Sequence, residues 1–105
     1  YVGLSTSVEN PQPAAATPKS FKLAQNFPNP FNPVTTINYT LPRKEHVSLR
    51  VINARGQVVA LLTDKEQQAG EHSVSFNGED LGSGVYFYQL QAGSYTRTRK
   101  MVLLK

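Results

Sequence analysis

The chain has 105 residues, of which 39% are hydrophobic and 17% charged, an ordinary composition for one globular domain. It has no cysteine, which excludes disulfides, thiolate metal sites and cysteine nucleophiles, and it has no apolar run long enough to span a membrane as a helix. The formal net charge is +4, and Arg97, Arg99, Lys100 and Lys105 concentrate cations at the end of the sequence. Such an excess is compatible with weak attraction to an anionic surface or with a basic, solvated strand edge.

The first twenty residues differ from the rest. Residues 10–20 contain three prolines, no large apolar side chain and no periodicity, which predicts a semi-extended linker. Residues 1–9 lack the basic and apolar regions of a signal peptide, and they are expected to finish a preceding domain or to form a loose strand. We therefore divide the chain into residues 1–20, a domain end with a linker, and residues 21–105, one folded domain.

Alternating polar and apolar residues predict β-strands through the whole of the second part. Six strands are expected, with a possible seventh at residues 21–23; the six cover residues 36–41, 47–51, 57–64, 72–76, 85–91 and 95–105. Turn residues separate them, and no segment has a helical period. The pattern indicates an all-β fold, an immunoglobulin-like antiparallel β-sandwich of about seven strands.

Three of these segments carry sharper expectations. Residues 53–56 read as a hairpin turn in which Gly56 takes a positive φ. Residues 58–62 are uniformly apolar, which is typical of a strand buried on both faces or of a short helical segment; the flanking turns and the length of the run favour the strand. The last strand is polar on both faces in its first half and apolar on both in its second, so its end is expected either to be central in a sheet or to await a partner.

Residues suited to catalysis or metal binding are scarce. His46 and His72 lie in or beside alternating strands and are expected at an edge or on the surface. Glu79 and Asp80 are adjacent in an extended turn, so their carboxylates point apart and make a poor acid–base pair. They match no EF-hand spacing, which leaves calcium binding there as a weak alternative. No catalytic residue, metal site or cofactor is predicted, and the chain is not expected to be an enzyme.

Aromatic residues near arginines allow a binding platform as a second interpretation. Tyr86, Tyr88 and Tyr95 lie on strands that neighbour Arg97 and Arg99, so they could stack on bases or sugars. Cross-strand packing in the core explains them more simply. No nucleic-acid partner is predicted, whereas an accessory carbohydrate-binding module, or a structural immunoglobulin-like module of a multidomain secreted enzyme, remains the alternative.

The most distinctive string is Gln25-Asn26-Phe27-Pro28-Asn29-Pro30-Phe31-Asn32-Pro33. Each proline fixes its own φ and favours extended geometry before it, and the asparagines can close turns on their own backbone. The string predicts a stiff loop that Phe27 and Phe31 anchor to the core. It could serve as a rigid entry to the first long strand or as a preformed surface for a receptor.

These residues resemble the opening of C-terminal sorting domains of the type IX secretion pathway. The resemblance covers about residues 6–105, because further motifs follow in the family's order at residues 47–51, 56–59, 69–72, 81–88 and 100–105. It implies a β-sandwich, a member of the Por secretion family of type A, appended to a cargo protein that passes through the periplasm to the cell surface or the medium. It also implies three partners besides the cargo: an outer-membrane translocon, a shuttle protein, and a sortase peptidase that cleaves within residues 9–20.

The resemblance also assigns recognition of the translocon or sortase to three short strings. They are Pro28, Asn29 and Pro30; Gly84, Val85 and Tyr86; and Lys100, Met101, Val102, Leu103, Leu104 and Lys105. An unpaired end of the last strand would additionally favour a dimer formed through that strand.

Overall fold

The computed structural model describes residues 19–105, which form seven β-strands. The expectations for residues 1–18, the preceding domain end and most of the linker, lie outside the described residues. The strands are β2 (Lys22–Leu23), β3 (Val34–Leu41), β4 (Glu45–Asn53), β5 (Val58–Gln67), β6 (Gly70–Asn77), β7 (Gly84–Ala92) and β8 (Tyr95–Leu103). Residues 19–105 contain no helix, and hence none that is long and apolar enough to cross a membrane.

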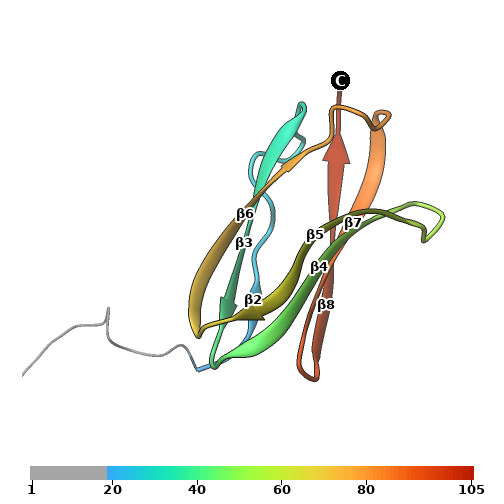
Figure 1. Ribbon diagram of the computed structural model, residues 1–105. Coiled ribbons are helices and arrows are strands. Elements are labelled where there is room, and N and C mark those ends of the chain that lie inside the picture. Colours follow the sequence, from blue (N-terminus) through green and yellow to red (C-terminus); the bar gives the residue numbers. More distant parts are fainter. Residues whose placement is uncertain (1–18) are drawn as a thin grey trace, which may run out of the picture.

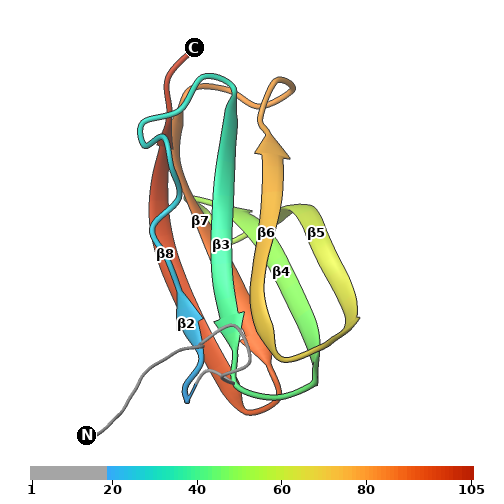
Figure 2. The ribbon, with the colours of Figure 1, turned by 90° about the vertical axis from the view of Figure 1, so that its left-hand side faces the viewer.

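The strands make two antiparallel sheets packed face to face (Figures 1 and 2). One sheet has the order β2-β3-β6 and the other has the order β5-β4-β7-β8. The chain therefore changes sheet after β3, after β5 and again after β6, which is the connectivity of immunoglobulin-like sandwiches. The all-β prediction is confirmed, including the short strand near residue 22.

The core lies between the sheets because every second side chain of the long strands points inward. Along β3, the side chains of Ile37, Tyr39 and Leu41 are buried while Val34 and Asn38 face outward. Strands β4, β6 and β7 follow the same rule. The buried core contains Leu23, Phe31, Ile37, Tyr39, Leu41, Val47, Leu49, Val51, Phe76, Tyr86, Tyr88, Leu90, Ala92, Met101 and Leu103.

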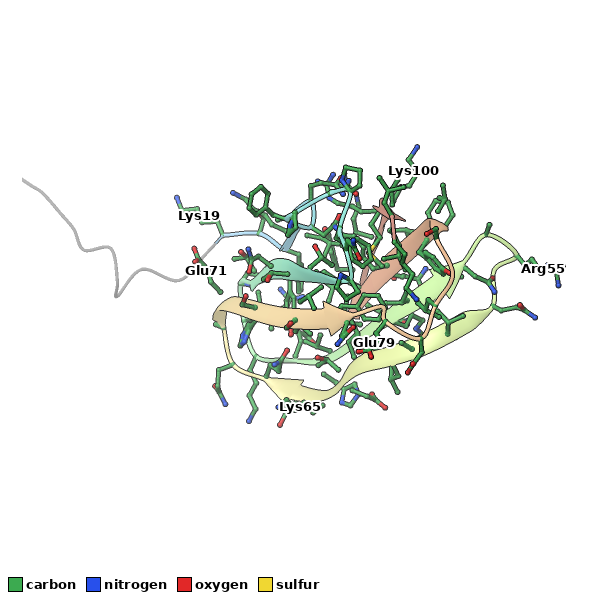
Figure 3. The ribbon with its side chains drawn as sticks, turned by 90° about the horizontal axis from the view of Figure 1, so that it is seen from above. Lys19, Arg55, Lys65, Glu71, Glu79 and Lys100 are labelled. Atoms are coloured by element: carbon green, nitrogen blue, oxygen red, sulfur yellow. The ribbon has the colours of Figure 1, made fainter. Side chains whose placement is uncertain are left out.

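The turn between β4 and β5 forms as the sequence predicts. The Asn53 side-chain oxygen accepts hydrogen bonds from the backbone N–H groups of Arg55 and Gln57, each at 2.9 Å. Gly56 has a φ of +87°, a conformation that side chains with a Cβ rarely adopt. The hairpin projects beyond the body of the sandwich, with Arg55 at its tip (Figure 3).

The prediction that residues 58–62 are buried on both faces is wrong. Strand β5 lies at the edge of its sheet, where Val58 and Leu61 are 55% and 57% exposed. Two register shifts against β4 add residues to this strand, so it bends away from a regular ladder. An uninterrupted apolar run cannot by itself distinguish a central strand from an irregular edge strand.

Tyr86 lies in the core, with 9% of its surface exposed, and its hydroxyl donates a hydrogen bond of 2.7 Å to the Gly82 carbonyl. Tyr86→Ala should lower the free energy of unfolding by about 3–5 kcal/mol, because it leaves a cavity the size of an aromatic ring. Tyr86→Phe should cost only about 1 kcal/mol, since it removes one hydrogen bond. Urea denaturation of the full chain measures both, and an alanine variant as stable as the phenylalanine variant would contradict this placement.

Candidate recognition surface

The proline loop, residues 24–33, lies against the end of strand β8 (Figures 1 and 2). Phe31 is 1% exposed and its ring packs edge-on against Phe76, with the ring centroids 6.0 Å apart. The prediction that Phe31 anchors the loop is therefore confirmed. The same prediction for Phe27 is wrong: its side chain is 78% exposed, because the backbone at this point pairs with Thr36 and turns the ring to solvent. All three prolines of the loop follow cis peptide bonds.

Phe31 also extends the four-stranded sheet by one residue. Its N–H donates to the Val102 carbonyl, and its carbonyl accepts from the Leu104 N–H, both at 2.9 Å. This is a parallel bridge on the side of β8 that faces away from β7. The end of β8 is thus neither central in a sheet nor unpaired, because the loop covers its outer edge.

Side chains of the loop complete this covering. The Asn29 side-chain oxygen accepts from the Val102 N–H at 2.9 Å, and the Gln25 amide donates to the Lys100 carbonyl at 2.8 Å. With Phe31, these contacts satisfy the Lys100 carbonyl, both backbone groups of Val102, and the N–H of Leu104, which follows the strand. Asn29 therefore bonds across to the strand, rather than closing a turn on its own loop as the sequence suggested.

A buried polar network holds the loop in shape from inside. The Tyr88 hydroxyl donates to the Ala24 carbonyl at 2.6 Å and accepts from the Asn26 N–H at 2.8 Å. The Asn26 side chain donates to the Thr35 hydroxyl at 2.9 Å and to the Pro28 carbonyl at 3.1 Å. Burial raises the pKa of Tyr88 above its ordinary value, although its hydrogen bond with Asn26 and the nearby charge of Arg99 oppose the shift.

The second predicted string lies beside the third, on the edge of β8 opposite the proline loop. In the β7–β8 ladder, Gly84 pairs with Leu103 and Val85 pairs with Val102. The Lys105 N–H donates to the Ser83 hydroxyl at 2.9 Å, and its ammonium group donates to the carbonyls of Glu79 and Leu81, the latter at 2.8 Å. All three strings, separated by up to some 70 residues in sequence, therefore meet at one end of the sandwich.

The first string is exposed throughout, whereas the other two strings present only some of their side chains to solvent. The exposed members are Pro28, Asn29, Pro30, Val85, Lys100, Leu104 and Lys105, whereas Gly84 and Val102 are half-buried. Tyr86, Met101 and Leu103 are buried in the core. These three residues pack in the core beneath the exposed members. Only the exposed members are accessible to a partner at this end.

Sequence reasoning missed two residues on which this end depends. Asn26 is 2% exposed, a polar side chain that the core admits only because its neighbours satisfy it. Gly78 is buried beneath Phe31, and a Cβ atom there would lie 3.1 Å from the Leu103 side chain. Asn26 looked like one of several turn asparagines and Gly78 like one of several loop glycines, so nothing in the sequence separated them.

The other candidate groups take ordinary structural positions. His46 is exposed, with its Nε2 atom 2.6 Å from the Asp64 Oδ1 atom, and the His72 ring stacks on the Tyr39 ring. No three histidine or acidic residues converge on a point within residues 19–105. The rings of Tyr86 and Tyr88 are buried, so the proposed aromatic platform does not exist as an exposed surface.

Removing the Tyr88 hydroxyl should loosen the loop. Tyr88→Phe leaves the Ala24 carbonyl and the Asn26 N–H without their partner, and we expect a loss of about 1–3 kcal/mol in the free energy of unfolding. Tyr95→Phe is the matched control, because the Tyr95 hydroxyl makes no hydrogen bond within residues 19–105 and its loss should cost almost nothing. Urea denaturation compares the two, and equal stabilities would contradict the role of Tyr88.

The free energy of unfolding at alkaline pH tests the same variant a second time. The pKa of Tyr88 is raised in the folded chain above 10.0, so at rising pH the unfolded chain loses this proton first. The resulting stabilisation is present below pH 10 and declines above it. Tyr88→Phe should show a shallower decline than the wild type.

Comparison with known proteins places this arrangement in context. A family model described as a secretion system C-terminal sorting domain matches residues 25–104. Among solved structures, the chain is similar to PorZ, an essential bacterial surface component of the type-IX secretion system of Porphyromonas gingivalis. The two are 15% identical with a TM-score of 0.54, and the match covers 89% of this chain and 12% of PorZ, which shows a shared fold. No curated protein matches the chain.

Proposed function

We propose that this chain, which belongs to the family of secretion system C-terminal sorting domains, acts as a type IX sorting signal through one end of its sandwich. The end of the sandwich that carries the proline loop and the end of β8 is the surface that the secretion machinery recognises. The attached cargo follows this domain through the periplasm and across the outer membrane, to the cell surface or the medium.

The observation that supports this proposal is the convergence of the three predicted strings. Pro28, Asn29 and Pro30 lie over the edge of β8, and Val85 pairs with Val102 on the neighbouring strand. The buried members of these strings form part of the core. Leu104 is 54% exposed beside the loop, so its side chain is available for contact with a partner.

The geometry favours recognition through side chains over addition of a strand at this position. The Lys100 carbonyl, both backbone groups of Val102 and the Leu104 N–H already have partners in the loop. A translocon or shuttle protein that added a strand here would first have to displace Phe31 from the core. A dimer formed through the same part of the strand would meet the same obstacle, so the proposed signal is monomeric at this edge.

Processing of the cargo belongs to the same proposal. A sortase would cleave within residues 9–20, ahead of the folded sandwich, and join the cargo to the cell surface. Extended backbone outside a packed domain is what a peptidase requires. The catalytic groups belong to the peptidase, and the sorting domain contributes only recognition.

Point variants of exposed leucines test the recognition surface without unfolding the domain. Leu104 and Leu61 are 54% and 57% exposed; Leu104 directly follows β8, and Leu61 lies on β5. In a host with a working type IX system, a reporter fused ahead of residues 1–105 should reach the surface or the medium. Leu104→Ser should reduce the secreted fraction by about tenfold, the effect of losing about 1.4 kcal/mol of binding, whereas Leu61→Ser should leave it unchanged.

Folding controls keep the result interpretable. Both serine variants should unfold within about 0.5 kcal/mol of the wild type, because surface substitutions rarely cost more. Equal secretion of both variants would remove this end as the recognition surface. Retention of the unmodified fusion in the periplasm, in folded form, would instead favour the accessory carbohydrate-binding module.

The position of cleavage is a separate prediction. Mass spectrometry of the secreted reporter should find its new C-terminus within residues 9–20, and inactivating the host's sortase should leave the domain attached. A cut inside residues 22–103 would contradict the proposal, because the strands there are packed. Surface attachment is read from the mass added to that C-terminus.

A further inference from the structure

A groove of about 280 Å³ lies on the side of the sandwich where β2 and β8 approach each other. Its walls come from β2, β3 and the first half of β8, including Leu23, Tyr39 and Tyr95. Two contacts join its walls. Phe21 stacks on Tyr95 at a centroid distance of 4.8 Å, and the Arg99 guanidinium donates to the Leu23 carbonyl at 2.5 Å.

The edge of β8 beside this groove is open, at the residues between the groove-lining Tyr95, Arg97 and Arg99. The N–H and C=O groups of Val102 bond to the proline loop, so they face away from β7. The backbone groups of Thr98 and Thr96 face the same way, because orientation repeats every second residue in an antiparallel strand. Within residues 19–105 these groups have no hydrogen-bond partner outside their own sheet. The loop that covers the end of β8 therefore leaves its middle uncovered.

The groove is also cationic. Lys22, Arg97 and Arg99 line it, and no lining residue among those described carries a carboxylate. Arg97 is exposed and forms no ion pair within residues 19–105, and Arg99 bonds only to a neutral carbonyl. Arg43 adds a further positive charge 5.2 Å from the Phe21 ring, although Glu45 pairs with it at 2.8 Å. Such a site attracts negatively charged groups, such as the carboxylates of an acidic partner.

We propose that this groove binds an extended acidic peptide by strand addition to the middle of β8. The open N–H and C=O groups of Thr96 and Thr98 bond to the peptide backbone, which distinguishes this ligand from a free anion. Residues directly opposite each other in paired strands point to the same face, so the peptide residues opposite Arg97 and Arg99 point into the groove. The preferred ligand therefore carries carboxylates two positions apart.

The groove and the recognition surface use different parts of one strand. Thr98 pairs with Gln89 of β7 and Val102 pairs with Val85, and four residues of strand span about 13 Å. Peptide binding thus adds a second interaction to the sorting domain. Peptide binding is tested without secretion, so either proposal can fail while the other holds.

Two peptides of identical composition make the test. Ac-Thr-Val-Asp-Val-Glu-Val-Thr-NH2 places both carboxylates on one face of a strand, and Ac-Thr-Val-Val-Asp-Glu-Val-Thr-NH2 places them on opposite faces. Each is titrated into the isotope-labelled full chain and followed by amide chemical shifts. The first should bind with a dissociation constant below about 1 mM and shift the amides of Thr96 and Thr98, about five- to tenfold more tightly than the second.

Charge variants locate the site. Arg97→Gln should weaken binding of the first peptide about five- to tenfold, because it removes an unpaired cation from the groove. Lys65→Gln is the matched control: Lys65 is an exposed cation on β5, at the opposite edge of the same sheet, where Figure 3 shows it across the molecule from Lys100. Binding to this control should equal binding to the wild type.

Three outcomes would overturn the proposal. Equal binding of the two peptides would show attraction to charge without strand pairing. Full competition by inorganic phosphate at constant ionic strength would identify a simple anion site. Shifts centred on β5, or no shifts up to the highest peptide concentration, would leave the groove without this ligand.

Discussion

Phe31 joins the proline loop to the sandwich in two ways at once, through its buried ring and through two backbone hydrogen bonds to β8. The ring cannot enter the core unless the loop lies along the strand, and the hydrogen bonds form only when it does. The exposed positions of Asn29 and Leu104 follow from this docking, as does the covering of the strand's end. Tyr88 and Asn26 hold the same arrangement from below.

The two edges of the four-stranded sheet are protected from pairing with other chains in different ways. A strand edge with free N–H and C=O groups invites pairing with other chains. Strand β5 has two register shifts and the charged residues Asp64, Lys65 and Glu66, which interrupt a flat ladder. Strand β8 is regular against β7 throughout, so its protection comes from outside, from the proline loop. That protection stops at Lys100 and gives way to inward-pointing arginines.

Alternation of polar and apolar residues was enough to predict the strands and the sandwich, because that period records which face each side chain takes. It could not give the order of strands within a sheet, and this is why residues 58–62 were misplaced. The proline string predicted a rigid loop, and it also predicted that the Phe31 ring anchors this loop to the core. That Asn29 reaches β8 depends on two segments far apart in sequence, a relation that no local pattern contains.

The division of β8 into a covered and an open part explains why its composition changes along its length. Met101 and Leu103 are buried where the loop and Phe76 enclose the end of the strand. Arg97 and Arg99 occupy the same inward face further back, where they line the groove beside the two-residue strand β2. A charged side chain is tolerated there because the groove is open to the surface, whereas the enclosed end of the strand would bury the charge. The polar first half and the apolar second half of β8 therefore match the open and the enclosed parts of its inward face.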